Sequence, residues 1–144
     1  MNYRHGFHAG NFADVFKHAL LVRLLLYLAR KDAPFRVIDT HAGEGAYDLT
    51  ADEASRTMEW ASGVGRLADL SGADTQAGAL LAPYIECLGP RDAQGRPYVY
   101  PGSPAIAARL MRAQDRAIFC ELRPDAFEAL RRRFGRDERV KTIH

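Results

Sequence analysis

The longest apolar run of the chain follows a segment that is crowded with polar side chains. This run, ALLVRLLLYLA, covers residues 19–29, and MNYRHGFHAGNFADVFKH precedes it. Asn11 is a favourable N-cap residue, so a helix is expected to begin just after it. We expect this helix to be buried through its apolar positions Val15, Phe16, Ala19, Leu20, Leu24 and Leu28. Helical spacing also brings Asp14, Lys17 and His18 onto neighbouring positions, which predicts a polar patch at the start of the helix.

The middle of the chain has the pattern of one short strand followed by helices. FRVID at residues 35–39 is typical of a buried strand and leads into the glycine-containing loop THAGEGAY. Residues 49–98 are mostly helical in pattern, which indicates a helical insertion after the first strand. In the following YPGSP segment, Ser103 is the expected N-cap of a helix and Pro104 its first residue.

Strands and helices alternate in the last third of the chain. RAIFCEL is a second short strand, PDAFEALRRRF is a helix that begins at Pro124, and RVKTIH is the start of a third strand. This alternation predicts the α/β class, with a parallel sheet and helices on its faces. We expect three parts: residues 1–48, with the first helix, strand and glycine loop; the insertion at 49–98; and a continuation of the sheet at 99–144. Three strands make only part of a doubly wound sheet, so we expect the reading frame to continue beyond His144.

Composition narrows the class of protein. The chain has 144 residues, 47% of them hydrophobic, which predicts one globular protein rather than a disordered one. The longest apolar run contains Arg23 and is too short to cross a membrane, and the N-terminus lacks a secretory signal pattern. Cys87 and Cys120 have no disulfide or zinc spacing. We therefore expect a soluble, cytoplasmic protein without a metal.

Charge is unevenly distributed although the net charge is only +2. Residues 1–31 carry five basic and one acidic side chains, and residues 123–144 carry seven and four. Such basic ends are compatible with the binding of a polyanion. If it is a nucleic acid, Tyr3, Phe7 and Phe12 are available to stack on its unpaired bases. Ordinary solvated helix faces explain the same charges equally well.

Candidate ligand-binding residues follow the predicted strands. Asp39 ends the first strand, and Gly43 and Gly45 lie in the next turn, where a backbone without Cβ atoms can approach a ligand. Glu121 ends the second strand, where an acid is able to bind both hydroxyls of a ribose. Asp48 occupies the place of the third glycine of a dinucleotide fingerprint, which disfavours a nicotinamide-dependent oxidoreductase. A plain tight turn and a solvated glutamate remain the alternatives.

These residues are similar to the first two motifs of class I S-adenosylmethionine-dependent methyltransferases, which implies a Rossmann-like sheet. Four segments in order, YRHGFHAGNFADVFKH, DTHAGEGAY, YPGSP and FCELRP, further resemble the large-subunit ribosomal RNA (adenine-N(6))-methyltransferase J family. The resemblance runs from Tyr3 to about residue 137. It implies methylation of the N(6) amine of an adenine in 23S ribosomal RNA, with S-adenosylmethionine as the cofactor and ribosomal RNA as the partner.

The resemblance also implies roles for individual residues. Four of them would contact the cofactor: His18, His41, Ser103 and Glu121. Asp39, Gly43 and Gly45 belong to the same cofactor site. Tyr3 would contact the substrate nucleotide, with His5 and Lys17 as its companions, so the polar N-terminal segment would cover the cofactor and the target base.

The sequence departs from the family in one respect. Amino methyltransferases of this kind use Asp or Asn followed by Pro-Pro and an aromatic residue to hold the target base, and the seven prolines of this chain are all isolated. We therefore expect no catalytic residue before His144, and we expect the chain to be inactive by itself. We also expect it to be a monomer. A nucleotide-binding or RNA-binding module without chemistry is the alternative. Metal binding by His5, His8, His18 and His41 is disfavoured, because no HExxH or similar ligand spacing is present.

Overall fold

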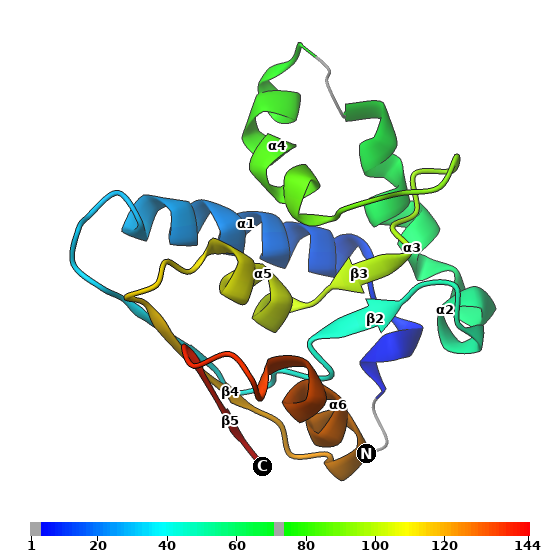
Figure 1. Cartoon of the computed structure of the whole chain (residues 1–144). Helices are drawn as coiled ribbons and strands as arrows, with labels where there is room; N and C mark the ends of the chain where they lie inside the picture. The colour runs from blue at the N-terminus through cyan, green and yellow to red at the C-terminus, as the bar shows by residue number, and fades with distance from the viewer. Residues whose placement is uncertain (1–3, 71–73) are drawn as a thin grey trace. The chain divides into compact units, whose positions relative to one another are not determined.

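The computed structural model describes residues 4–70 and 74–144, and the chain divides into two compact units (Figure 1). The helical unit comprises the described residues of Met1–Leu20 and Tyr47–Tyr100. The sheet unit comprises Leu21–Ala46 and Pro101–His144. Helix α1 (Phe12–Leu28) contributes its first turns to the helical unit and its last turns to the sheet unit.

Three parallel strands form the centre of the sheet unit. They are β1 (Arg36–Asp39), β4 (Arg116–Cys120) and β5 (Val140–Ile143), in the order β1-β4-β5. Asp39 pairs in register with Phe119, and Cys120 pairs with Ile143. The prediction of an α/β protein with a parallel sheet is confirmed.

One face of this sheet is covered by helices. Ala117 and Phe119 of β4 are buried against the last turns of α1, helix α5 (Ser103–Leu110) and helix α6 (Pro124–Phe134). The Phe119 and Phe134 rings pack edge to face with their centroids 5.2 Å apart. The core of the sheet unit therefore lies on one side of its three strands.

The helical unit consists of short helices and one small sheet. Strand β2 (Ala46–Asp48) pairs with β3 (Val99–Pro101), a pairing that the sequence pattern did not predict. The helices are η1 (His5–Phe7), α2 (Asp52–Thr57), α3 (Glu59–Ser62), η2 (Val64–Leu70) and α4 (Gln76–Cys87). The N-terminal segment crosses this unit closely, because Val64 N donates to Gly10 O at 2.8 Å. A Cβ atom on Gly63 would lie only 2.1 Å from the same carbonyl oxygen.

The structure corrects two local predictions, one for the buried face of α1 and one for the start of α5. Asn11 does cap α1, since its Oδ1 accepts from Asp14 N at 3.0 Å. The expected buried positions Phe16, Leu20, Leu24 and Leu28 are nevertheless exposed, and the buried positions are Asp14, His18, Val22 and Leu25. The prediction was wrong because α1 is apolar on both faces, so periodicity alone does not identify the covered one.

Ser103 is the second correction. Gly102 stands at the N-cap position of α5 without a side-chain capping bond, so the helix begins at Ser103 and Pro104 is its second residue, one position later than predicted. The Ser103 hydroxyl is bonded elsewhere.

Among the described residues, no helix is both long and apolar enough to span a membrane. The division at residues 48 and 98 stays a prediction.

Candidate functional site

Two carboxylates lie at the carboxyl ends of neighbouring parallel strands in the sheet unit. Asp39 is the last residue of β1, and Glu121 directly follows β4, its neighbour. In an open parallel sheet, this edge is where ligands bind. The sequence pattern predicted both positions, and the structure places them on adjacent strands.

Asp39 is held by hydrogen bonds on both of its oxygens. The Ser103 hydroxyl donates to Oδ2 at 2.6 Å, and the His41 backbone N–H donates to Oδ1 at 3.0 Å. The His41 ring is itself oriented by a 3.0 Å hydrogen bond between its Nδ1 and Thr40 Oγ1. Asp39, His41 and Ser103, for which the family resemblance implies a place in the cofactor site, therefore form one connected cluster.

Glu121 is fixed by backbone amides. Gly43 N donates to its Oε2 at 2.8 Å, and Arg123 N donates to its Oε1 at 2.8 Å. The glycine loop is also joined to β4 through a bond from Ala42 N to Cys120 O at 2.9 Å. A carboxylate offers about four lone-pair sites, so Glu121 keeps acceptor capacity for two hydroxyls beyond these two amides.

The two glycines of the loop have different structural roles. Both adopt positive φ, 60° for Gly43 and 81° for Gly45. A Cβ atom on Gly45 would lie 2.6 Å from the Phe134 ring, so Gly45 lets the loop pack onto α6. The amide of Gly43 instead points to Glu121, which makes Gly43 the glycine that is bonded to the carboxylate at the end of β4.

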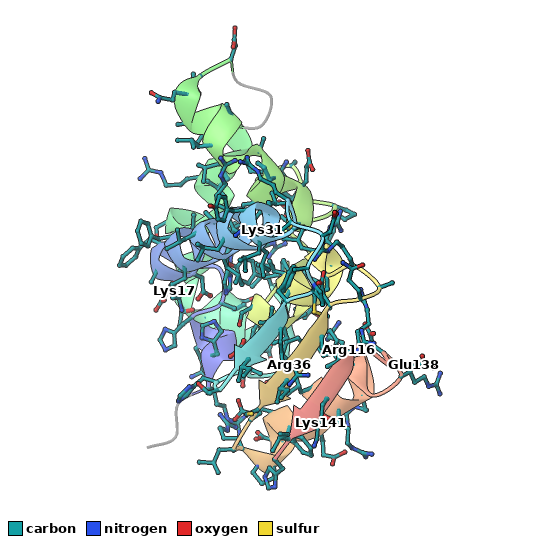
Figure 2. The ribbon with its side chains drawn as sticks, turned by 90° about the vertical axis from the view of Figure 1, so that its left-hand side faces the viewer. Lys17, Lys31, Arg36, Arg116, Glu138 and Lys141 are labelled. Atoms are coloured by element: carbon teal, nitrogen blue, oxygen red, sulfur yellow. The ribbon has the colours of Figure 1, made fainter. Side chains whose placement is uncertain are left out.

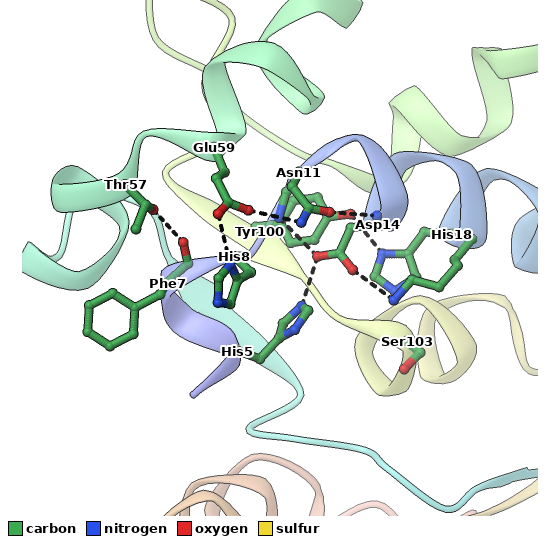
Figure 3. Close-up of polar contacts among 12 residues, drawn as sticks. His5, Phe7, His8, Asn11, Asp14, His18, Thr57, Glu59, Tyr100 and Ser103 are labelled. Atoms are coloured by element: carbon green, nitrogen blue, oxygen red, sulfur yellow. Dashed lines mark hydrogen bonds and ion pairs between the residues drawn. The ribbon is translucent and has the colours of Figure 1, made fainter. Parts of the chain in front are cut away.

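Polar side chains of the N-terminal segment gather around Asp14 in the helical unit (Figure 3). Asp14 is only 1% exposed and accepts from His5 Nε2 at 2.8 Å and from Gly10 N at 3.0 Å. Lys17 Nζ lies 3.1 Å from its other oxygen. Burial raises the pKa of Asp14, but the hydrogen bond and charge of His5, with smaller effects of His18 and Gly10, lower it to about 2. The proposed substrate residues His5 and Lys17 thus share one buried carboxylate.

The same N-terminal segment is anchored to the helical insertion. Glu59 accepts from His8 Nδ1 at 2.9 Å and from Asn11 Nδ2 at 3.0 Å (Figure 3). The Thr57 hydroxyl donates to Phe7 O, and Arg4 forms an exposed ion pair with Glu53. The sequence placed Asp14 in a polar patch with Lys17 and His18, and the Asp14–Lys17 pair is present. Sequence reasoning missed the bond from His5 to Asp14 and the role of Glu59, because these partners are recognisable only once the fold is known.

His18 lies in a buried chain of hydroxyl groups in the helical unit. Its Nδ1 is 2.7 Å from Tyr100 OH, which is 2.9 Å from Tyr84 OH. Burial raises the pKa of both tyrosines, so they remain neutral hydroxyls at physiological pH. Tyr3, the predicted substrate contact, lies outside the described residues. Within residues 4–70 and 74–144, no three His, Cys, Asp or Glu side chains are grouped closely enough to hold a metal ion.

Comparisons with known proteins identify relatives for nearly the whole chain. It is 40% identical over 141 residues to Ribosomal RNA large subunit methyltransferase J of Haemophilus influenzae and 40% identical over 141 residues to the protein of that name from Escherichia coli. A crystal structure of a Legionella pneumophila protein matches with a TM-score of 0.77 and 35% identity over 95% of this chain.

The chain spans about half the length of these relatives. It covers 49% of each of the two methyltransferases and 49% of the Legionella protein. The family model described as Ribosomal RNA large subunit methyltransferase D, RlmJ, matches residues 32–144, a range that includes both strand-end carboxylates and the glycine loop. The chain therefore belongs to this ribosomal RNA large subunit methyltransferase family.

Proposed function

We propose that this chain forms the cofactor-binding part of an S-adenosylmethionine-dependent enzyme that methylates the N(6) amine of an adenine in 23S ribosomal RNA. Family membership supports the reaction class and the ribosomal RNA substrate. The observation that carries the cofactor assignment is the fixed Glu121 carboxylate beside the glycine loop of a parallel sheet.

Glu121 has the chemistry that a ribose requires. Its two oxygens each accept one backbone amide, and the remaining lone pairs are able to accept the two ribose hydroxyls of a nucleoside. Because both amides belong to the backbone, the carboxylate is oriented before the ligand arrives, and less entropy is lost on binding. S-adenosylmethionine supplies the sulfonium methyl group that is transferred.

The Asp39 cluster would hold the amino-acid end of the same cofactor. Asp39 presents a negative charge, Ser103 fixes its orientation, and the neighbouring His41 ring offers a nitrogen. A carboxylate is a suitable partner for the ammonium group of a methionine moiety. We assign His18, Gly43 and Gly45 to the cofactor site as well, on the strength of the family resemblance.

The polar N-terminal segment is the proposed contact for the RNA. Tyr3 would stack on the displaced adenine, while His5 and Lys17 lie at Asp14. We further propose that this chain alone transfers no methyl group, because its sequence contains no Pro-Pro pair and hence no amino-methyltransferase motif. A monomeric, cytoplasmic, metal-free protein is part of the same proposal.

Titration calorimetry with S-adenosylhomocysteine, the stable product of the cofactor, tests the assignment. Glu121→Gln should weaken binding about ten-fold or more, because a neutral amide is a poorer acceptor for two hydroxyls. Glu138→Gln is the matched control, since Glu138 is an exposed glutamate of the same unit and should bind like the unchanged protein. Equal affinity for Glu121→Gln and Glu138→Gln would reject Glu121 as the ribose ligand.

A further inference from the structure

Two buried tyrosines lie beside His18 in the helical unit. Tyr84 of α4 is 1% exposed, Tyr100 of β3 is 0% exposed, and His18 of α1 is 6% exposed. Tyr100 OH lies 2.7 Å from His18 Nδ1 (Figure 3) and 2.9 Å from Tyr84 OH. The His18 and Tyr100 rings are also stacked, with their centroids 5.6 Å apart and an angle of 29° between their planes. We call Tyr84 and Tyr100 the tyrosine pair.

The hydrogen bonds of the tyrosine pair can run in two directions. A phenol has one hydrogen to donate, and a neutral imidazole has one N–H and one acceptor nitrogen. In the first direction, Tyr84 donates to Tyr100, Tyr100 donates to His18 Nδ1, and the imidazole hydrogen is on Nε2. In the second direction, His18 Nδ1–H donates to Tyr100, which donates to Tyr84. The Tyr84 hydrogen then needs an acceptor elsewhere.

Only the first direction gives every phenol hydrogen an acceptor. Within residues 4–70 and 74–144, Tyr100 is the one hydrogen-bond partner of Tyr84 OH. The Cys87 thiol lies close enough to affect the pKa of Tyr84, but a thiol is a weak acceptor. Burial raises the pKa of both tyrosines, so both phenol hydrogens are present. A buried hydroxyl hydrogen without an acceptor is costly, and the first direction is therefore favoured.

The charges around Asp14 are compatible with a neutral His18. Asp14 lies one turn before His18 on α1 and accepts from His5 Nε2 at 2.8 Å. Lys17 Nζ is 3.1 Å from the other oxygen of Asp14, and the Lys17 side chain is 60% exposed at the surface of α1 (Figure 2). Because Lys17 balances the negative charge of Asp14, the cluster does not require a second proton on the His18 ring.

We propose that the tyrosine pair positions His18 as a hydrogen-bond donor, by holding its ring in the tautomer that carries the hydrogen on Nε2. Tyr100 fixes Nδ1 as the acceptor nitrogen, and Tyr84 makes Tyr100 a stronger donor, since successive hydrogen bonds polarise one another. A donor nitrogen suits the carboxylate of the methionine moiety, which is a strong acceptor. This last step rests on the proposed function, in which His18 belongs to the cofactor site. Tyr84 and Tyr100 are thus positioning residues that act through His18.

Nitrogen NMR of the histidine rings tests the tautomer without any ligand. Long-range ¹H–¹⁵N spectra of the 144-residue chain are recorded at a pH about 1.5 units above the ordinary histidine pKa. His18→Gln identifies the His18 signals by their loss. We expect the chemical shift of an unprotonated nitrogen at Nδ1 and that of a protonated nitrogen at Nε2. The reverse pattern, or two protonated nitrogens, would overturn the proposal.

Tyr100→Phe tests whether Tyr100 holds the ring, because it removes the hydroxyl and keeps the aromatic side chain. Tyr98→Phe is the matched control, since Tyr98 is an exposed tyrosine of the same unit. Tyr100→Phe should move the His18 Nδ1 signal, whereas Tyr98→Phe should leave it at its position in the unchanged chain. An Nδ1 signal at the same position in both variants would contradict the role of Tyr100.

Titration calorimetry with S-adenosylhomocysteine tests whether Tyr100 acts through His18. Tyr100→Phe should weaken binding about five-fold when His18 is present, because the ring loses its fixed tautomer. In the His18→Gln background, the same substitution should weaken binding by less than about two-fold. An equal loss in both backgrounds would overturn the proposal, because Tyr100 would then have only a structural role. Absence of binding by the unchanged chain would instead reject the proposed function, and the nitrogen shifts would still decide the tautomer.

Discussion

Replacement of Asp14 by asparagine should destabilise the helical unit by an amount that depends on pH. The carboxyl group is 1% exposed, and its pKa is lowered from 3.8 to about 2 by its partners, chiefly His5, despite the opposing effect of burial. A shift of this size corresponds to about 2 kcal/mol of folding free energy, since one pKa unit is worth about 1.4 kcal/mol. Asp14→Asn keeps the shape of the side chain but removes the charge, so we expect a loss of about 2 kcal/mol at pH 7.

The sign of the pH dependence follows from the direction of the shift. The folded-state pKa lies below the unfolded one, so the stabilisation is fully present above the unfolded pKa and is lost as pH falls through the folded pKa. The difference in unfolding free energy between the two proteins should therefore fall to about half at pH 3 and vanish below about pH 2.

Urea unfolding followed by tryptophan fluorescence is the appropriate assay. Trp60 is the one tryptophan of the sequence, and it is buried within the helical unit that contains Asp14. Asp69→Asn is the control, because it removes the same charge from an exposed position of that unit and should change stability by less than about 0.5 kcal/mol. A difference between Asp14→Asn and the unchanged protein that stayed constant from pH 7 to pH 2 would refute the linkage argument.

Three further predictions concern Gly63, Ser103 and Arg4, with Gly89→Ala and Ser103→Thr as comparison variants. Gly63→Ala should unfold the helical unit or lower its stability by about 3 kcal/mol or more, because the new Cβ would lie 2.1 Å from Gly10 O. Gly89→Ala should lower stability by only about 1 kcal/mol, since φ is 69° at Gly89 but no atom lies within 4 Å of the new Cβ. Urea unfolding by fluorescence and circular dichroism distinguishes the two, and equal stabilities would contradict the close crossing. Ser103→Ala should lower the stability of the sheet unit by about 1–3 kcal/mol, because it removes the 2.6 Å hydrogen bond to Asp39. Ser103→Thr keeps a hydroxyl and should lower stability less. Equal losses of stability in thermal melts of the two variants would show that the hydroxyl does not matter. Arg4→Ala should weaken the binding of ribosomal RNA fragments and reduce its salt dependence in filter-binding assays, because one phosphate contact is lost, and unchanged binding would remove Arg4 from the RNA interface.

The strand-end residues could be predicted from the sequence because their signals are local. FRVID is a short apolar segment that ends in Asp39, and RAIFC is one that Glu121 follows directly. The glycines after Asp39 mark a turn with positive φ. The parallel pairing of β1 with β4 was predictable because strands and helices alternate in the last third of the chain. The sequence alone therefore locates Asp39 and Glu121 at the ends of their strands.

The remaining features depend on contacts between distant residues. Ser103 is as suitable for capping a helix as for bonding Asp39, and only the position of β1 decides between the two roles. Glu59 gives no sign in the sequence that it receives His8 and Asn11 from 48 and more residues away. The prediction of the buried face of α1 was wrong for a related reason. A helix that is apolar on both faces has no periodic pattern that distinguishes its buried face from its exposed one.

The central claim is that the carboxyl ends of β1 and β4 bind S-adenosylmethionine through Glu121 and the glycine loop. Amide resonances of the 16.0 kDa chain, recorded by ¹H–¹⁵N correlation spectroscopy during titration with S-adenosylhomocysteine, test it at the level of single residues. The account predicts that the Gly43 and Arg123 amides, which bond Glu121, are among the most strongly shifted, and that Glu121→Gln abolishes these shifts. Saturable shifts confined to other parts of the chain, or no shifts at millimolar ligand, would contradict it.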